Sequence, residues 1–134
     1  MVLFTGMEGD WQRNRKYHGG PQRALCLYSK ERLDALAGEG HPVFPGALGE
    51  NVTIAGLDWA RVQPGARLRI GEVECEVTDF AVPCRNLQPF FRDGVFVRVG
   101  QKQRHGWSRA YARVLIEGRI AVDDIVSLEY INNY

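Results

Sequence analysis

Cysteine is scarce in this sequence, with three cysteines among 134 residues and no Cys-x-x-Cys pair. An odd number of cysteines without paired spacing argues against a disulfide framework and against a zinc ribbon. No signal peptide opens the sequence, so we expect a cytoplasmic protein whose thiols are reduced.

Long hydrophobic runs and an excess of one charge are also missing. Apolar stretches extend for a handful of residues before Gly, Pro or a charge interrupts them, far short of the ~20 residues that span a bilayer. Seventeen Lys and Arg against sixteen Asp and Glu give a formal net charge of +1. We therefore expect a soluble protein that binds neither membranes nor nucleic acid, and any basic site must be local.

Glycine and proline are plentiful, and fifteen glycines and six prolines divide the chain into short segments that favour β structure. This punctuation predicts a mainly β fold, a barrel or a sandwich, with a single domain over residues 1–134. Residues 87–100 fit a buried strand and a packed helix equally well. Strands are predicted at 51–54, 67–70, 73–79, 112–116 and 125–130.

One helix is predicted, at residues 30–37. Ser29 precedes it as an N-cap, Leu33 and Leu36 follow at helical spacing, and Gly38 ends it. We expect this helix to pack outside the barrel or across one end of it.

Cys84 differs from the other two cysteines. Cys26 and Cys75 lie in segments where apolar residues alternate, so we interpret both as small core residues. Cys84 follows a proline where a predicted strand ends and precedes Arg85, whose guanidinium would favour the thiolate. The thiolate is the form that ligates soft metals or attacks sulfur, although an exposed thiol without a function fits the same pattern.

Two polar blocks precede Cys84. In His18-Gly19-Gly20-Pro21 the glycines give a ligand close access to the backbone, although the block also fits a turn with a capping histidine. The second block is Leu48-Gly49-Glu50-Asn51-Val52-Thr53. Its Asn51 offers a hydrogen-bond donor and an acceptor, which could bind the edge of a heterocycle or satisfy the backbone groups of a turn.

Basic residues gather in two places along the chain, and each group fits either a phosphate site or a solvated surface. They are Arg13, Arg15, Lys16 and Arg23 around His18, and Arg104, Arg109 and Arg113 farther along.

The ordered set of motifs resembles the MOSC domain family, named for the C-terminal domain of molybdenum cofactor sulfurases. The motifs are Gly-Asp, His-Gly-Gly-Pro-x-Arg-Ala with Leu-Tyr-Ser, Pro-Gly-x-x-Gly-Glu-Asn-x-Thr with Gly-Leu, Pro-Gly-x-Arg-Leu-x-Ile-Gly, Pro-Cys, and Gly-Trp with Ala-Arg-Val-Leu-x-x-Gly. They extend over roughly residues 6–129. The resemblance implies a single β-barrel like that of the pyruvate kinase barrel domain, with one or two short helices.

The resemblance also implies binding of the molybdenum-pterin cofactor, molybdopterin. Cys84 matches the family cysteine, which would make it the metal ligand and the catalytic residue. We expect Cys84, His18 and Asn51 to surround one pocket. The implied cofactor-binding residues are His18, Arg23, Asn51, Thr53 and Arg85.

Three functions are open under this resemblance. The first is a reductase of N-hydroxylated compounds, which needs an external electron-donor protein because the sequence has no iron–sulfur, haem-attachment or dinucleotide-binding motif. The second is a sulfur or cofactor carrier that holds a persulfide on Cys84 received from a sulfur-donor protein. The third is a barrel that binds a small molecule or a protein without metal chemistry.

Two departures from the family pattern bear on assembly and on one turn. Relatives normally place at least one strand ahead of the point where Gly6 lies, and its absence would leave a sheet edge open, so we expect a homodimer that covers this edge. Before the last strand, Asp123-Asp124 stands where the family has Gly-Asp, so that turn has lost its usual glycine.

Overall fold

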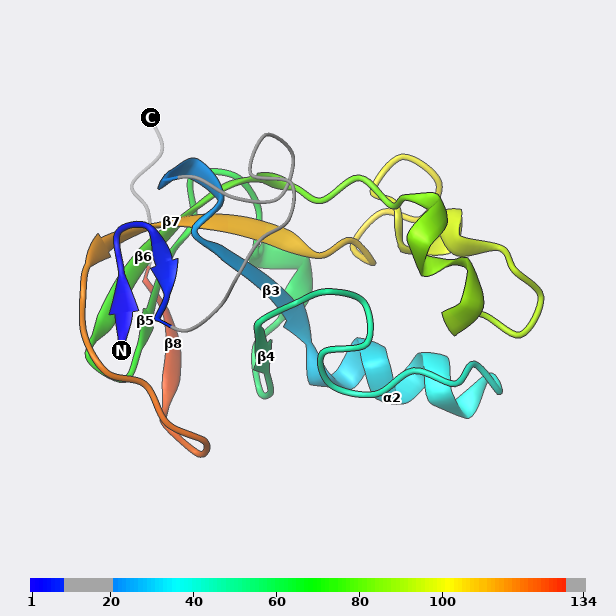
Figure 1. Cartoon of the computed structure of the whole chain (residues 1–134), viewed down its shortest axis with the longest axis horizontal. Coiled ribbons are helices and arrows are strands. Elements are labelled where there is room, and N and C mark those ends of the chain that lie inside the picture. The colour runs from blue at the N-terminus through cyan, green and yellow to red at the C-terminus, as the bar shows by residue number, and fades with distance from the viewer. Residues whose placement is uncertain (9–20, 130–134) are drawn as a thin grey trace.

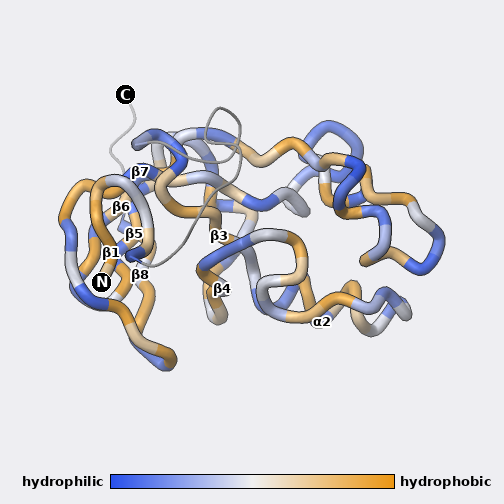
Figure 2. Tube along the Cα trace, in the orientation of Figure 1, coloured by the Kyte–Doolittle hydropathy of each residue, from blue (hydrophilic) through white to orange (hydrophobic). Residues whose placement is uncertain are grey.

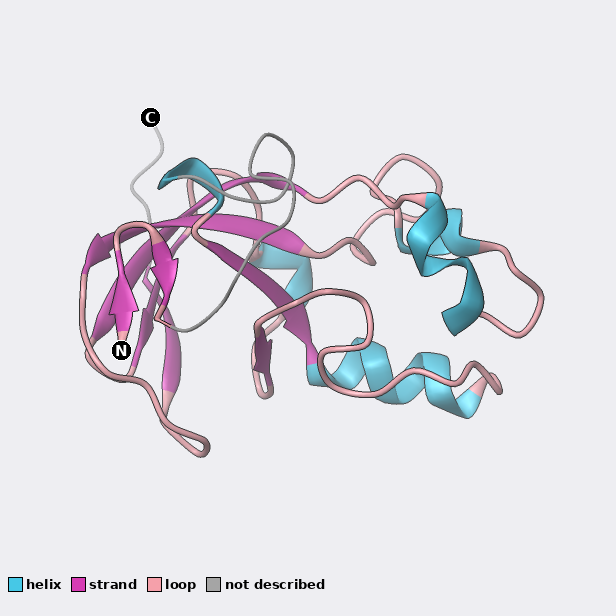
Figure 3. Cartoon of the chain, in the orientation of Figure 1, coloured by secondary structure: helices cyan, strands magenta, loops and turns pink. Residues whose placement is uncertain are grey.

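The computed structural model describes residues 1–8 and 21–129, and this part of the chain is mainly β, as predicted (Figure 1, Figure 3). Its centre is a six-stranded sheet in the order β4-β3-β7-β6-β5-β8, in which β3 and β4 are parallel and the other neighbours antiparallel. The sheet curls into a half-barrel, which confirms the barrel-like fold. Its strands are β3 (Leu25–Ser29), β4 (Val52–Ile54), β5 (Arg67–Ile70), β6 (Val73–Phe80), β7 (Ala110–Ile116) and β8 (Val126–Glu129).

Alternating apolar residues explain the pairing of β5 with β6. Every second side chain of the two strands is buried, while the residues between face outward. The strands meet at Gly71, whose φ is +55°, and a Cβ there would lie 2.5 Å from Asp124 Oδ2. The turn therefore requires glycine. The buried residues of this pair include Leu68, Ile70, Val73, Cys75 and Val77.

A short hairpin, β1 (Val2–Leu3) and β2 (Gly6–Met7), lies outside the main sheet. The backbone N–H of Val2 donates to the Gly118 carbonyl at 2.7 Å, and the N–H of Gly118 donates back at 3.1 Å. Two-residue strands are too short to show an alternating pattern, so the sequence does not predict this hairpin.

The predicted helix is confirmed as α2 (Lys30–Gly38), which continues from the end of β3 and lies beyond the sheet (Figure 1). The Ser29 hydroxyl accepts a hydrogen bond from the Arg32 N–H at 3.1 Å, as an N-cap does, and Leu33 and Leu36 are buried. No helix in the described part of the chain is long and apolar enough to cross a membrane. Apolar stretches of the trace are short and interrupted by polar ones (Figure 2).

Residues 87–100 form neither a strand nor a continuous helix. They contain most of η3 (Arg85–Phe90) and all of η4 (Phe96–Val99), two short 3₁₀ turns. Gly94, with φ +72°, separates the turns, and the Asp93 carboxylate accepts from the Val95 N–H at 3.0 Å. Leu87, Phe91 and Val99 anchor successive turns in the core, whereas Val95 and Val97 are exposed, which explains why the apolar spacing follows neither regular period.

The last two predicted strands form but do not pair with each other. β7 lies between β3 and β6, whereas β8 pairs with β5 at the far side of the sheet. Their connection passes the β5–β6 turn, where the Glu72 carboxylate accepts from the Arg119 N–H at 2.8 Å. β4 and β8 are therefore the two edges of the sheet.

Candidate functional site

A cavity of about 280 Å³ lies where β3, β7, the loop before β4 and the segment after β6 meet. It combines apolar walls with groups that can carry chemistry, as small-molecule sites commonly do. The apolar walls come from Ala47, Leu48, Leu87 and Phe90. The groups that can bind or react are Cys26, Cys84, Asn86, Arg109 and Tyr111.

Cys84 is the most accessible of the three cysteines, and it lines this cavity. It follows β6 in extended conformation, and its carbonyl accepts from the Leu87 N–H at 3.0 Å, which begins η3. Cys75, by contrast, is fully buried in the core, and burial raises the pKa of its thiol to about 12. Cys84 can therefore meet a ligand, whereas Cys75 is structural.

Cys26 lines the same cavity, although it is buried as predicted. Burial raises the pKa of its thiol to about 11, while the nearby Arg109 guanidinium acts in the opposite direction. The Asn51 carboxamide oxygen accepts from the Cys26 N–H at 2.9 Å, and the Asn51 N–H donates to the Cys26 carbonyl at 3.0 Å. Asn51 thus fixes the backbone of β3 behind the cavity and is not part of its lining.

Arg109 is the least expected residue of the site, because its side chain is only 5% exposed. Its Nη1 donates to the Leu48 carbonyl at 2.7 Å, and Nη2 lies 3.5 Å from the Val82 carbonyl. Its Nε has no hydrogen-bond partner among residues 1–8 and 21–129. Gly49, with φ +90°, lies against this guanidinium, and a Cβ there would be 3.7 Å from Nη1.

The sequence cluster of Arg104, Arg109 and Arg113 is divided by the fold. Arg104 stacks on Trp107, with its guanidinium carbon 3.6 Å from the ring centroid. Arg113 pairs with Glu76 across the β6–β7 ladder. Of the three, only Arg109 enters the cavity.

Comparison with known proteins matches the MOSC domain family to residues 14–127. This chain belongs to the MOSC domain family. YflK from Bacillus subtilis is 35% identical over 125 residues, which are 90% of this chain and 54% of YflK. YiiM from Escherichia coli is 33% identical over 132 residues, 92% of this chain and 56% of YiiM. The chain therefore spans little more than half the length of these relatives.

The crystal structure of YiiM from Escherichia coli gives a TM-score of 0.72 at 27% identity, over 100% of this chain and 63% of that one. The likeness agrees with the half-barrel and with the family membership. MOSC domains are associated with proteins of the molybdenum cofactor. The single domain expected over residues 1–134 stays a prediction.

The residues implied by the MOSC resemblance do not all lie at the Cys84 cavity. Arg23 forms an ion pair with Asp79 at 3.1 Å and lies 4.8 Å over the ring of Tyr111, a cavity residue. Arg85 follows Cys84 but is exposed and outside the lining. His18 lies outside the described residues.

Thr53 lines a different cavity, of about 450 Å³, between the two sheet edges. That cavity is bounded by β4 on one side and by β8 with the loop before it on the other. The exposed apolar residues Val122 and Ile125 belong to this loop.

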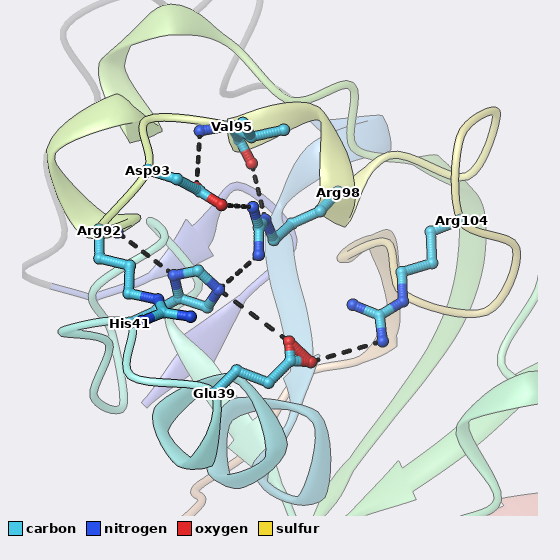
Figure 4. A network of polar contacts seen from close by, with 7 residues as sticks. All are labelled: Glu39, His41, Arg92, Asp93, Val95, Arg98 and Arg104. Carbon is cyan, nitrogen blue, oxygen red and sulfur yellow. Dashed lines mark hydrogen bonds and ion pairs between the residues drawn. The ribbon is translucent and has the colours of Figure 1, made fainter.

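His41, in the loop after α2, contacts Arg92 and Arg98 of the segment that follows the cavity wall (Figure 4). His41 is 3% exposed, and its ring packs edge-on against Phe91 at 5.2 Å. Its Nδ1 lies 3.2 Å from the Arg92 backbone nitrogen, and its Nε2 faces the Arg98 guanidinium; both partners are donors, and a neutral ring can accept from one of them. The Arg98 guanidinium also contacts this ring and is held by Asp93.

Proposed function

We propose that this MOSC domain binds the molybdenum-pterin cofactor in the 280 Å³ cavity, with Cys84 as the metal ligand. The observation that carries the proposal is an accessible thiol and a buried guanidinium in one cavity. A thiolate is a soft ligand suited to molybdenum, and a cation suits the negatively charged cofactor. The association of the family with molybdenum cofactor proteins supports the same assignment.

The metal-binding side chains among the described residues favour a metal that arrives as part of a cofactor. In the described part of the chain, no group of three His, Cys, Asp or Glu side chains could hold a bare metal ion. A metal beside Cys84 therefore needs further ligands from the molecule that carries it. Bound there, molybdenum would supply two-electron redox chemistry.

Several side chains of the cavity have roles under this proposal. Cys84 binds the metal, Arg109 neutralises negative charge, and the Asn86 amide offers hydrogen bonds to a heterocycle. Leu87 and Phe90 exclude water from that side. His18, Arg23, Asn51, Thr53 and Arg85 are additional cofactor-binding residues that the resemblance implies.

The reaction we propose is reduction of an N-hydroxylated compound. The N–O bond breaks, an N–H bond forms, and the oxygen leaves as water after uptake of two electrons and two protons. An external donor protein supplies the electrons, since the sequence has no motif for a flavin, haem or iron–sulfur cluster.

The second candidate function is sulfur carriage through a Cys84 persulfide. The observation that favours it is a second thiol, Cys26, in the same cavity. A sulfur-donor protein would transfer one sulfane sulfur atom to the Cys84 thiolate, and an acceptor would remove it. Mass spectrometry of the Cys84 peptide, isolated without reductant, should then show the added sulfur atom.

Metal analysis of freshly purified protein tests the main proposal. We expect molybdenum and pterin in the wild type, their loss in Cys84→Ser, and their retention in Cys75→Ala, which changes a buried cysteine away from the cavity. Wild-type protein without molybdenum, made in cells that synthesise the cofactor, would contradict the proposal. That result would favour the sulfur carrier or a barrel without metal chemistry.

A further inference from the structure

We propose that Arg109 makes the Cys84 cavity a binding site for an oxyanion, held by the buried guanidinium. The ligand group is a compact anion with several oxygen atoms, either free in solution or at the end of a larger ligand. The proposal concerns the charge of the ligand and does not depend on the metal. It can therefore stand if the cofactor assignment fails.

Arg109 forms no direct ion pair among the described residues. A guanidinium stays charged at every pH at which proteins are folded, and burying it without an anion is strongly unfavourable. The hydrogen bonds of Arg109 go to the carbonyls of Leu48 and Val82, which are neutral.

Glu50 is a buried acid whose charge interacts with that of Arg109, although no ion pair or hydrogen bond joins the two side chains in the described part of the chain. It is 5% exposed, and its Oε1 accepts from the Leu48 N–H at 3.2 Å. Within the part of the chain that the structure describes, its Oε2 has no hydrogen-bond partner, and neither has Arg109 Nε. Burial raises the pKa of Glu50, whereas the charge of Arg109 lowers it. Because no directly bonded carboxylate balances Arg109 among the described residues, it can pair with an anion in the cavity that it lines.

There is space for a ligand beside the Arg109 guanidinium. Arg109 lines the cavity, whose 280 Å³ is several times the roughly 30 Å³ that a water molecule occupies in the liquid. Gly49 has no side chain to cover the guanidinium, and its φ of +90° disfavours any replacement. The Asn86 amide supplies additional donors on the same lining. The cavity thus offers a fixed cation, neutral donors and room for a compact anion.

Alkylation of Cys84 measures the charge of the cavity directly. We compare iodoacetate, which is anionic, with neutral iodoacetamide, and locate the modified cysteine by peptide mass mapping. The ratio of the two rates at Cys84 should be several-fold higher in folded protein than in the same protein unfolded in urea. It should fall several-fold in Arg109→Gln and stay unchanged in Arg113→Gln, a partly exposed arginine of β7 that does not line the cavity.

Protection by oxyanions tests binding itself. Molybdate, phosphate and sulfate are added at millimolar concentration to protein made without molybdenum supplementation, with chloride at equal ionic strength as the control. We expect at least one of them to slow the reaction of Cys84 with iodoacetamide saturably in the wild type and in Arg109→Lys. Arg109→Gln should lose this protection, and circular dichroism checks that it is folded.

The outcomes separate this inference from the cofactor proposal. Saturable protection that depends on Arg109 supports the oxyanion site even if purified protein contains no molybdenum. If Cys84 is protected from alkylation only in protein that carries the molybdenum cofactor, the oxyanion in the cavity is a group at the end of the cofactor. Equal reagent ratios in folded and unfolded wild type, or no saturable protection by any of the oxyanions and no loss of cofactor in Arg109→Gln, would overturn it.

Discussion

At the scale of single residues, the backbone conformation of Asp123 is unusual. Asp123 has a φ of 74°, which side chains other than glycine rarely adopt. It is the position where the resemblance to the MOSC pattern places glycine, the residue that adopts such a φ most easily. Asp tolerates this conformation better than most residues because its short side chain can bond locally.

Asp123→Gly is expected to stabilise the protein. Glycine relieves the left-handed strain, and its greater freedom in the unfolded chain offsets part of the gain, which leaves up to about 1 kcal/mol in the free energy of unfolding. Asp123→Ala should lower the free energy of unfolding, because alanine has the strain without the polar side chain. Urea denaturation measures both, and a stability loss in Asp123→Gly would contradict the argument.

At the scale of elements, His41 joins the loop after α2 to the η3–η4 segment, which also contributes Leu87 and Phe90 to the Cys84 cavity. Burial is the main cause that lowers the pKa of His41 below the usual imidazole value of 6.5, and the charge of Arg98 adds to it. Arg92 acts in the same direction, whereas Asp93 and Glu39 act against it. The neutral ring also keeps one nitrogen free to accept from Arg92 or Arg98.

Stability should therefore fall as the pH drops below 6.5. Above that value His41 is neutral in both the folded and the unfolded protein, whereas below it the unfolded chain takes up a proton that the folded protein resists. Urea denaturation between pH 7.5 and pH 5 measures this slope. It should be smaller in His41→Asn, while the exposed His105→Asn should keep it; an equal slope in His41→Asn would exclude His41 as its source.

At the scale of the whole molecule, the half-barrel leaves two sheet edges with the 450 Å³ cavity between them. Val122 is 92% exposed and Ile125 85% exposed beside this opening. Open edges and exposed apolar residues are features that proteins normally cover with a partner. The expected absence of a strand ahead of Gly6 is wrong, because β1 (Val2–Leu3) lies there, and the open edges are β4 and β8. The homodimer stays a prediction, and we propose that a second copy covers this face.

The homodimer prediction is tested by light scattering. We expect twice the chain mass at micromolar concentration and a shift toward monomer in the Val122→Asp, Ile125→Asp double variant. Phe44→Asp changes an exposed apolar residue that does not line this cavity, so it serves as the control. A wild type that is monomeric at all working concentrations would refute the prediction.

The supply of electrons also concerns the whole molecule, because it depends on which redox cofactors the chain has motifs to bind. Protein loaded with molybdenum cofactor should reduce an N-hydroxylated base when a chemical reductant is added and should be inactive with NADH alone. Turnover with NADH and no second protein would show that the external donor is unnecessary. Full activity in Cys84→Ser would remove Cys84 from the mechanism.

The fold could largely be predicted because its signals are local. Alternation in 67–70 and 73–79, the Ser29 cap and the spacing of Leu33 and Leu36 each report burial within one element. Residues 87–100 were ambiguous because their anchors belong to turns of irregular spacing. Pairing of β8 with β5, rather than with β7, depends on contacts between distant segments and left no local signal.

By itself, the sequence determined the mainly β fold, the helix after Ser29, the MOSC motif order and Cys84 as the accessible thiol. Only the tertiary structure decided that Cys26 and Arg109 share a cavity with Cys84, and that Thr53 lies at another one. The physical reason is that a cavity is formed by side chains brought together from distant parts of the chain. Arginine is ordinarily exposed, so its burial depends on neighbours that no local pattern records.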